Sequence, residues 1–519
     1  MRVPLTPLRF LYRARDQFGS KVGIVDAGRS WTYREFSRRC HRLAAILSSW
    51  RLPAGSRVAL LSYNQHPLLE AYYGVPLAGC ILLPLNTRLR AADFRHILND
   101  AGARVLIFHP DFLPVVEEIR RDLHSVGRFL LLEPGPSADW VEPGSYRHLM
   151  ETGECAADRD IAGVDEEDVA ELFYTSGTTA LPKGVMLTHR NLYLHALEVS
   201  LALGIRDEDT QLHTIPLFHV NGWGTPQFLT CLGGRHVLMK RFHPGDAYRL
   251  IQEHGVTFFF LVPTMAISLL NHSERDRFDT SSVRLINLGG AAANPRLVEQ
   301  LEAAFDCRCV AGYGLTECSP VVTLSFPKSH LAVQGERRLA LQSMTGYPIP
   351  GVELALLDGQ GRSLPWNGSD LGEIAIRGDG VMKGYWGQAE PAAAAGNWLR
   401  TGDLATIDPD GYVQIVDRKK DIIVSGGENI SSLEVERVLL THPGVLECAV
   451  IPVPDEHWGE IPKAVVVPRT PDCVTPKALV SYCRRRLASF KVPRIVELVA
   501  DLPKGGTGKI LKRELRKRG

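Results

Sequence analysis

Residues 174–184 read YTSGTTALPKG and follow a short apolar run, residues 169–173, that the sequence predicts to be a buried strand. Glycine lets the backbone turn its N–H groups toward an anion, hydroxyls donate to phosphate oxygens, and lysine adds a point charge. The spacing is not that of a Walker loop, G-x-x-x-x-G-K-S/T. We therefore expect a polyphosphate-binding loop that leaves a strand, with a plain flexible Ser/Thr/Gly loop as the alternative. The residue types that suit phosphate are Thr175, Ser176, Gly177, Thr178, Thr179, Lys183 and Gly184.

The alternation of strand-like and helix-like segments on both sides of this stretch indicates an α/β fold. Residues 57–62, 81–85 and 105–109 are strand-like, and residues 66–78 and 91–101 have helical apolar spacing. A similar order returns with strands over 256–262, 283–288 and 309–311, and with helices after Pro263 and over 295–305. Such alternation predicts two doubly wound units with mostly parallel sheets, whose ligands lie at the carboxyl ends of the strands.

Beyond about residue 340 the pattern changes to that of smaller units. Residues 346–358 and 372–377 read as short strands between Gly, Pro and Asp turns, which predicts a small β subdomain. After a strand over 413–416 and the charged run DRKKD, helices are expected over 432–440 and 477–487, and strands over 445–452 and 464–468. We place a domain boundary near residue 418, although a solvated turn is the simpler interpretation of a charged run.

Composition and charge exclude several classes of protein. A chain of 519 residues with 45% hydrophobic and 23% charged residues predicts two or more globular domains. A net charge of +1 favours neither nucleic acid nor an anionic membrane, and no apolar run reaches the ~18 residues of a spanning helix. The N-terminus lacks the apolar core of a signal peptide. The ten cysteines show no metal-ligand spacing and read as reduced thiols, so we expect a cytoplasmic protein.

Four further motifs carry residue types that suit a nucleotide. Gly289-Gly290-Ala291 leaves room for a flat group against the backbone, or for close helix–strand packing. Residues 312–317, GYGLTE, offer an aromatic ring, a hydroxyl and a carboxylate, which suit a base, a phosphate and Mg²⁺. Asp403 in the turn TGD can accept from both ribose hydroxyls, and Lys509 lies on the glycine-rich stretch PKGGTGKI. Each motif alone also fits a turn, a packed tyrosine or a basic tail.

The order of these motifs resembles that of the adenylate-forming enzymes, the superfamily of acyl-CoA synthetases, peptide-synthetase adenylation domains and beetle luciferases. YTSGTT, GGA, GYGLTE, TGD, DRKKD with SGGENI, and TGK follow the family's order, and WTYREF and WGEIPKAVVV add to the match. Ala180 stands where the family usually has glycine. The resemblance implies a large N-terminal domain, residues 1–417, that includes the small β subdomain, and a small mobile α+β domain, residues 418–519.

The resemblance also implies an ATP site assembled from many of these residues. It places the phosphates on Thr175, Ser176, Gly177, Thr178, Thr179 and Lys183. It places the adenylate phosphate on Thr316, and Mg²⁺ on Glu317 with Thr175. Adenine would stack on Tyr313 and be lined by Gly290, Ala291 and Gly312, and the ribose would be held by Asp403 and Arg418. Gly314 is also implied to bind the nucleotide.

Catalysis and domain motion follow from the same resemblance. The implied catalytic residues are Lys183, His219, Thr316, Glu317 and Lys509, of which Lys509 is the adenylation lysine. Lys420 takes the hinge position, and Gly426 and Gly427 line the tunnel for the pantetheine arm of coenzyme A. One small domain cannot present Lys509 and this tunnel at once, so we expect it to rotate between the two half-reactions.

Residues 216–224, PLFHVNGWG, resemble the acyl-pocket segment of bacterial medium- and long-chain fatty acyl-CoA synthetases. Trp223 resembles a tryptophan that gates the acyl tunnel, and plain core packing is the alternative. The segment holds no acidic side chain for an α-amine, and no carrier-protein segment follows Lys509, which disfavours an amino-acid adenylation enzyme. The pocket residues implied are His219, Val220, Trp223, Gly224, Gly290 and Gly314.

We therefore expect an ATP-, Mg²⁺- and CoA-dependent carboxylic acid:CoA ligase that forms an acyl-adenylate and then a thioester, releasing AMP and pyrophosphate. The expected substrate is a medium- to long-chain fatty acid. An aryl or other small acid is the alternative, followed by amino-acid adenylation and a luciferase-like monooxygenase. The expected partners are these small molecules, with no nucleic acid and no integral membrane association. A homodimer is one open option for the assembly.

Overall fold

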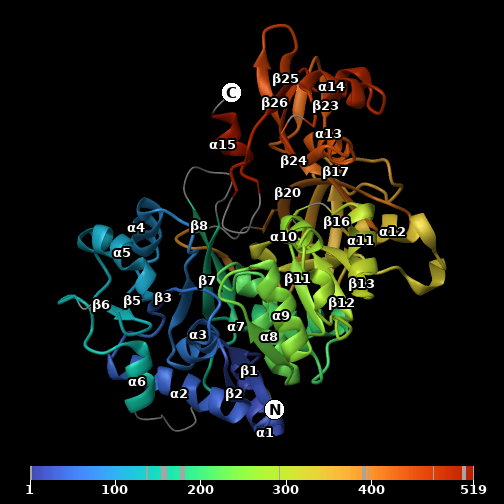
Figure 1. Cartoon of the computed structure of the whole chain (residues 1–519). Coiled ribbons are helices and arrows are strands. Elements are labelled where there is room, and N and C mark those ends of the chain that lie inside the picture. The colour runs from blue at the N-terminus through green and yellow to red at the C-terminus, as the bar shows by residue number, and fades with distance from the viewer. Residues whose placement is uncertain are drawn as a thin grey trace.

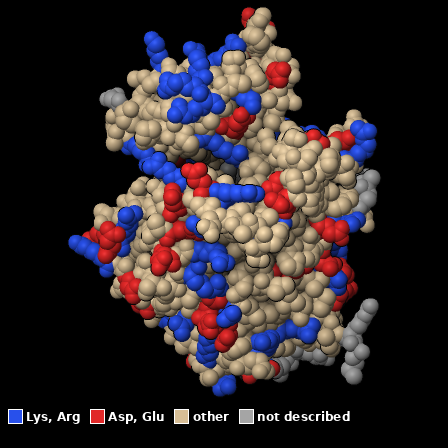
Figure 2. Space-filling model, turned by 90° about the vertical axis from the view of Figure 1, so that its right-hand side faces the viewer, with Lys and Arg blue, Asp and Glu red and all other residues tan. Residues whose placement is uncertain are grey.

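The computed structural model describes residues 3–135, 138–153, 161–175, 182–291, 293–388, 393–394, 397–471, 473–504 and 510–517. Most of the chain forms a large lower part, and the C-terminal residues form a smaller upper part (Figure 1). Figure 2 shows acidic and basic side chains interspersed over one face of the lower part, and more basic than acidic side chains on the upper part.

One large sheet contains the strand that leads into the 174–184 stretch. Its strand order is β18-β8-β7-β4-β3-β5-β6. The strands β7, β4, β3, β5 and β6 run parallel, whereas β8 pairs antiparallel with both β7 and β18. Their bounds are β3 Arg57–Leu61, β4 Ile81–Pro84, β5 Val105–Phe108, β6 Arg128–Leu131, β7 Val169–Thr175, β8 Lys183–Thr188 and β18 Gly384–Tyr385.

The second large sheet has nine strands in the order β15-β14-β13-β12-β11-β9-β10-β1-β2. Its centre is parallel, and the antiparallel strands lie at its two edges. The bounds are β1 Val22–Asp26, β2 Arg29–Thr32, β9 Thr210–His213, β10 Arg235–Leu238, β11 Phe258–Leu261, β12 Leu285–Leu288, β13 Arg308–Gly314, β14 Val321–Leu324 and β15 Tyr347–Pro348.

Helices connect and cover these strands, and several begin at capping residues. Thr32 and Glu35 form a capping box at the start of α2, and Thr188 and Asn191 form the same arrangement at α7. The bounds are α1 Leu8–Phe18, α2 Tyr33–Ser49, α3 His66–Leu77, α4 Ala91–Asp100, α5 Leu113–Ile119, α6 Tyr146–Thr152, α7 His189–Leu203, α8 Val220–Leu232, α9 Pro244–His254, α10 Pro263–Leu270, α11 Pro295–Phe305 and α12 Gly335–Ser343.

Two of these helices, α3 and α8, are buried on almost every side. Both are apolar around most of their circumference, which is the pattern of a helix inside a core. The hydroxyls of Tyr72 and Tyr73 on α3 donate to the carbonyls of Leu217, at 2.6 Å, and Pro226, at 2.7 Å. One large hydrophobic cluster runs through these helices and the strands around them. The two large sheets therefore share a core.

An antiparallel sheet of five strands follows, in the order β16-β17-β20-β19 with β21 paired to β20. It is the predicted β subdomain. Its register places Asp403 opposite Arg418, which brings both side chains to the same place. The bounds are β16 Val352–Leu357, β17 Gly372–Gly378, β19 Ala393–Ala394, β20 Trp398–Ile407 and β21 Val413–Arg418.

The upper part has its own sheet and two small hydrophobic clusters. Asp417, at the end of β21, accepts hydrogen bonds from the backbone and hydroxyl of Ser432, at 2.5 and 2.7 Å, and so fixes the start of α13. The strands are β22 Ile423–Ser425, β23 Glu428–Ile430, β24 Val445–Asp455, β25 Gly459–Pro468 and β26 Ile495–Leu498. The helices are α13 Ser432–Leu440, α14 Pro476–Arg484 and α15 Lys512–Arg516.

The predicted fold class is confirmed: two doubly wound, mostly parallel sheets and a β subdomain form a large N-terminal part, and an α+β unit follows. The helices α11 and α13 have the predicted bounds. The domain boundary at residues 417 and 418 stays a prediction. Within the described residues, no helix has the length and apolarity that a membrane crossing requires.

Candidate active site

The motif residues lie at the carboxyl ends of parallel strands in the two large sheets, β7 in one and β12 and β13 in the other. The strand β7 ends at Thr175, β12 leads into Gly289 and Gly290, and β13 ends at Gly314. Because Leu288 of β12 pairs with Ala311 of β13, the two glycine segments that follow these residues are neighbours. Gly290, Ala291 and Gly314 are exposed, and Gly312 is half-buried. The carboxyl ends of β12 and β13 therefore present a glycine-lined, open surface next to Tyr313.

Tyr313, Asp403 and Arg418 come from three strands and meet through one carboxylate. The Tyr313 hydroxyl donates to Asp403 Oδ2 at 2.6 Å, and Arg418 Nε lies 3.2 Å from Asp403 Oδ1. Burial, and next the charge of Asp403, raises the pKa of Tyr313 well above its usual value. Asp403 is buried while Arg418 is exposed, so the guanidinium faces the open side of the group. The predicted base and ribose residues are thus brought together.

The turn that carries Asp403 is fixed by its neighbours. The Asp403 N–H donates to Thr401 Oγ1 at 3.1 Å, and the Gly402 N–H donates to Glu373 Oε1 at 3.1 Å. The left-handed φ of +75° at Gly402 favours glycine at this position. Glu373 also accepts from Arg400 at 2.6 Å. The carboxylate of Asp403 is therefore held in place before any ligand arrives.

A second group joins Glu317, Tyr385 and Lys183. The Tyr385 hydroxyl donates to Glu317 Oε1 at 2.9 Å, and Lys183 Nζ lies 5.1 Å from the centre of the Tyr385 ring. Burial, and next the charge of Glu317, raises the pKa of Tyr385. Thr316, in the same short 3₁₀ turn as Glu317, is buried. A lysine and a carboxylate of the predicted phosphate and metal site thus share one tyrosine.

Glu317 fits the chemistry of a magnesium site completed by substrate. Within the described ranges, no cluster of three or more His, Cys, Asp or Glu side chains could hold a metal ion by itself. Mg²⁺ prefers oxygen ligands and is usually held by one or two carboxylates together with substrate phosphates. A single half-buried carboxylate next to a lysine suits such a shared site.

The segment predicted to line the acyl pocket has an unusual backbone. Residues 220–224, which we call the left-handed turn, all have positive φ, from +32° at Val220 to +87° at Gly224. Left-handed helical conformations cost L-residues roughly 1–2 kcal/mol each, so they persist only where packing enforces them. His219 precedes this turn and is half-buried. The turn brings Trp223 back toward β12.

The benzene end of the Trp223 indole lies against the Gly289-Gly290 segment. A Cβ at Gly289 would stand 2.8 Å from Cη2 of Trp223, and a Cβ at Gly290 would stand 3.1 Å from Val262. The indole also stacks on Phe260, with 5.6 Å between ring centres. Trp223 is 9% exposed. The flat group that the two glycines accommodate in this structure is therefore the protein's own tryptophan.

The C-terminal candidates follow β21 in the chain. Gly426 and Gly427 form the turn between β22 and β23, with φ of +59° and +87°, and both are exposed. The Gly426 N–H donates to the Trp458 carbonyl at 2.8 Å. Lys420 is exposed, and burial of part of its side chain, followed by the charge of Arg418, lowers its pKa. The residues Ser176, Gly177, Thr178, Thr179, Ala180 and Lys509 lie outside the described residues.

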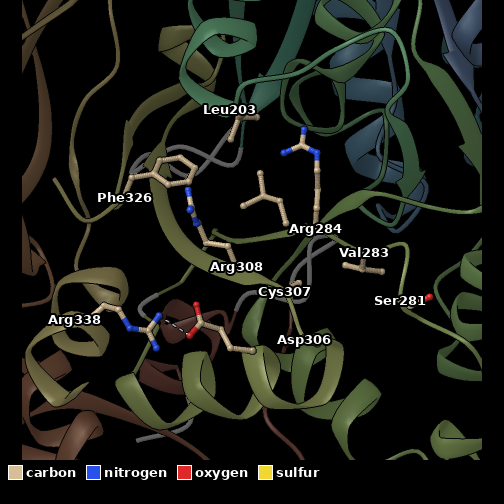
Figure 3. A pocket seen from close by; sticks show the side chains of 11 residues that line it. Leu203, Ser281, Val283, Arg284, Asp306, Cys307, Arg308, Phe326 and Arg338 are labelled. Atoms are coloured by element: carbon tan, nitrogen blue, oxygen red, sulfur yellow. Dashed lines mark hydrogen bonds and ion pairs between the residues drawn. The ribbon is translucent and has the colours of Figure 1, made fainter. Parts of the chain in front are cut away.

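A cavity of about 810 Å³ lies at the amino ends of β12 and β13 in the nine-stranded sheet, opposite the carboxyl ends that carry the motif residues (Figure 3). Three arginines line it. Arg284 pairs with Asp209 at 2.7 Å, and Arg338 pairs with Glu302 at 2.8 Å. Arg308 lies over the Phe326 ring. Because two of the three cations are already neutralised and the motif residues are at the other ends of these strands, this cavity is not the candidate site.

Sequence reasoning missed Tyr385, Phe260 and Val262, which the structure brings next to the predicted site residues. Gly384-Tyr385 repeats the glycine–tyrosine pair of the 312–317 motif, and this was the available signal. Phe260 and Val262 lie in an apolar run that reads only as a buried strand. Their place beside Trp223 and Gly290 depends on tertiary packing, which local pattern does not encode.

Two family models match the chain. The model described as AMP-binding enzyme matches residues 11–386, and the model described as AMP-binding enzyme C-terminal domain matches residues 434–509. A long-chain-fatty-acid–CoA ligase of Thermus thermophilus is 38% identical, with 98% of this chain and 94% of the relative covered.

A feruloyl-CoA synthase of Amycolatopsis sp is also 38% identical, with 96% of each chain covered. Among solved structures, the anthranilate CoA ligase AuaEII in complex with anthranoyl-AMP superposes with a TM-score of 0.89. It is 27% identical, with 100% of this chain and 98% of that chain covered. The three relatives are named for three different acids, one of them a long-chain fatty acid and two aromatic.

Proposed function

Since the chain belongs to the AMP-binding enzyme family and is an AMP-forming acid–thiol ligase that uses ATP, Mg²⁺ and CoA, we propose that its acid substrate is a medium- to long-chain fatty acid. The observation that carries the proposal is the apolar wall of Trp223, Phe260 and Val262 beside Gly289 and Gly290. Such a wall suits an uncharged tail. The Thermus relative, named for a long-chain fatty acid, supports the same choice.

We assign the chemistry to the residues of the two groups described above. A carboxylate oxygen of the acid attacks the α-phosphorus of ATP, and the bond to the β-phosphate breaks, which gives an acyl-adenylate and pyrophosphate. Lys183, the hydroxyls of residues 175–179 and Lys509 would neutralise charge on the phosphate oxygens. Asp403 and Arg418 would hold the ribose, with Tyr313 against adenine. When bound at Glu317, Mg²⁺ would polarise a phosphoryl oxygen.

The second half-reaction needs a different arrangement of the C-terminal part. The CoA thiol, having lost its proton, attacks the acyl carbon as a thiolate, and AMP leaves with the electron pair of the broken carbon–oxygen bond. We propose that Gly426 and Gly427 line the path of the pantetheine arm. They lie in the turn between β22 and β23, distant in sequence from Lys509, which supports rotation of a domain 418–519 about Lys420 between half-reactions.

An aryl acid is the second candidate substrate, because the Trp223–Phe260 stack offers an aromatic wall. The feruloyl-CoA and anthranilate CoA relatives support this reading. A screen of acids from acetate to palmitate, with benzoate and cinnamate, separates the two. Preference for benzoate over octanoate would overturn the fatty-acid proposal. Pyrophosphate exchange driven by amino acids, or light emission in the presence of O₂, would overturn the ligase assignment as well.

From the contact of Trp223 with Gly289 we predict how kcat/KM depends on the chain length of the acid. Each buried methylene contributes about 0.8 kcal/mol, or roughly a fourfold gain in kcat/KM, until the tunnel ends. Trp223→Phe should therefore shift the chain length of the best acid and leave the KM for ATP nearly unchanged. The measurement is kcat/KM over the acid series for both proteins.

Trp31 provides the matched control, because it has the same 9% exposure and also stacks on a ring, that of His66. It lies in β2, at the far edge of the nine-stranded sheet. Trp31→Phe should scale all acids alike. If Trp223→Phe also changes every acid by one constant factor, Trp223 only packs the core.

We also propose that the protein is cytoplasmic and that it forms a homodimer. The cysteines of the described residues are free thiols and most are buried, which supports a reducing compartment. Titration of thiols in the unfolded, unreduced protein would find all ten free. Sedimentation at micromolar concentration would decide between monomer and dimer.

A further inference from the structure

Tyr385 belongs to a short strand that is fastened to the phosphate-side strand β8. Tyr385 pairs with Val185, and Gly384 pairs with Met186. The flanking bonds run from Lys383 N–H to the Met186 carbonyl at 3.0 Å and from Trp386 N–H to the Gly184 carbonyl at 2.7 Å. The backbone of Tyr385 is therefore fixed relative to Lys183, the first residue of β8.

The side chain of Tyr385 contacts two opposite charges in two different ways. Its ring face lies under Lys183 Nζ, a cation–π contact, and its hydroxyl donates to Glu317 Oε1. The Met382 N–H donates to the Glu317 carbonyl at 2.8 Å, so Glu317 is also tied to the Tyr385 segment by its backbone. In the part of the chain that the structure describes, no ion pair joins Lys183 to Glu317.

An ammonium and a carboxylate on the same tyrosine would otherwise attract each other, because their interaction strengthens in a half-buried site. A direct ion pair would neutralise both groups. The lysine would then be less able to bind a phosphate, and the carboxylate less able to bind a divalent cation. The ring of Tyr385 satisfies the cation, while its hydroxyl satisfies one carboxylate oxygen without adding charge.

We propose that Tyr385 is a positioning residue that keeps Lys183 and Glu317 apart, so that the lysine stays available to nucleotide phosphate and the carboxylate to Mg²⁺. The proposal rests on the proposed roles of Lys183 and Glu317 in ATP binding. It assigns separate tasks to the two halves of the side chain. The hydroxyl orients Glu317, and the ring shields Lys183.

Two substitutions separate these tasks, with ATP binding followed by calorimetry at a series of Mg²⁺ concentrations. Tyr385→Phe keeps the ring and removes the hydroxyl. It should raise the Mg²⁺ concentration for half-maximal ATP binding by about tenfold, the effect of one hydrogen bond to a charged group, and leave metal-free ATP binding unchanged. Tyr385→Leu removes the ring as well, and should weaken ATP binding by about tenfold even without Mg²⁺.

Tyr482 supplies the control. Its hydroxyl lies 3.0 Å from Thr441 Oγ1, and Arg486 lies over its ring at 3.7 Å, so it has both kinds of contact in the C-terminal part. Tyr482→Phe should leave ATP and Mg²⁺ binding as in the unsubstituted protein.

Glu317→Gln distinguishes failure of this inference from failure of the proposed site. If Glu317→Gln shifts the Mg²⁺ dependence but both Tyr385 variants bind ATP and Mg²⁺ normally, Tyr385 is only a packing residue and the inference is wrong. If Glu317→Gln leaves the Mg²⁺ dependence of ATP binding unchanged, the proposed role of Glu317 in binding Mg²⁺ is wrong, and the inference about Tyr385 is wrong with it. A shift of the Mg²⁺ dependence in Tyr385→Phe and loss of metal-free binding only in Tyr385→Leu would support it.

Discussion

Asp403 joins side chains that are far apart in the chain, because Tyr313 and Arg418 both bind its carboxylate. The carboxylate is buried and its turn is held by Thr401 and Glu373, so its oxygens are oriented in advance. Preorganised acceptors of this kind lose little entropy when a ligand binds.

Removal of the Asp403 charge should therefore weaken nucleotide binding. Asp403→Asn keeps the size and one carbonyl acceptor but loses the ion pair to Arg418. Hydrogen bonds to charged groups contribute about 1.5–3 kcal/mol, so the KM for ATP should rise about 10- to 100-fold. Initial rates of pyrophosphate release over an ATP series measure this.

Asp358→Asn is the matched control for Asp403→Asn. Asp358 is also a turn aspartate of the β subdomain, and it accepts from Arg362 at 2.8 Å away from the site. Its substitution should leave the KM for ATP unchanged. An equal KM in the two variants would mean that Asp403 does not contact the nucleotide.

Several of these residues could be predicted from the sequence and others could not. Tyr313 and Asp403 stand in short motifs whose residue types already limit their chemistry. Tyr385 and Phe260 owe their place to pairing and packing between segments that are distant in the chain. Ser176 and Lys509 lie outside the described residues, so their phosphate-binding roles remain predictions.

At the scale of elements, the left-handed turn over residues 220–224 is the feature that local sequence rules do not anticipate. Three of its five residues carry a Cβ, and such residues adopt this conformation rarely. The turn is enclosed by packing: a Cβ at Gly224 would stand 3.2 Å from the His195 ring, and a Cβ at Gly222 would stand 3.2 Å from Leu217. Tertiary contacts therefore decide its shape.

Gly224→Ala should destabilise the protein more than an alanine at a comparable glycine. Gly224 has a φ of +87° and faces the buried ring of His195. The backbone strain costs about 1–2 kcal/mol, and the contact with His195 adds to it. The expected result is a lower Tm and a weaker affinity for the acid, measured by thermal unfolding and by steady-state kinetics.

Gly255→Ala isolates the backbone contribution. Gly255 ends α9 with a φ of +59°, and no atom lies within 4 Å of the position a Cβ would take. It should lower the Tm by less than Gly224→Ala and leave acid affinity unchanged. Equal losses in the two variants would show that the left-handed turn has room for a methyl group.

The regular elements were predictable for a simple reason. Strand-like apolar runs and helical spacing dominate residues 57–108 and 258–311, where both faces of each strand are buried. The antiparallel pairing of β8 with β7 and with β18 was not predicted. These pairings depend on which strand lies at the edge of the sheet, and the local sequence pattern does not contain that information.

At the scale of the whole molecule, three buried histidines link stability to pH. Burial lowers the pKa of His195 and of His213 to about 3, and lowers that of His236 as well. His213 Nε2 and His236 Nδ1 are 3.0 Å apart, so one shared hydrogen bond joins two neutral rings. The folded protein keeps these rings uncharged, while the unfolded chain protonates them near pH 6.5.

The free energy of unfolding should therefore fall as the pH drops from about 6.5 toward 3, and these histidines should add no pH dependence above that window. The Val321 N–H donates to His195 at 3.0 Å, and His195→Gln keeps an acceptor for it. This substitution should make the free energy of unfolding fall less steeply as the pH drops. Thermal unfolding from pH 4 to pH 8 measures the slope. The exposed His243 is the control, and an unchanged slope in His195→Gln would contradict the prediction.

The hydrogen bonds from Ser432 to Asp417 have a kinetic consequence. If the C-terminal part turns about Lys420, Asp417 stays with β21 while Ser432 moves, so these two bonds must break in every catalytic cycle. The rate at which they break would then set an upper limit on turnover, however fast the chemistry at phosphorus is. Two hydrogen bonds that contact none of the substrates would then limit the turnover rate of such a ligase.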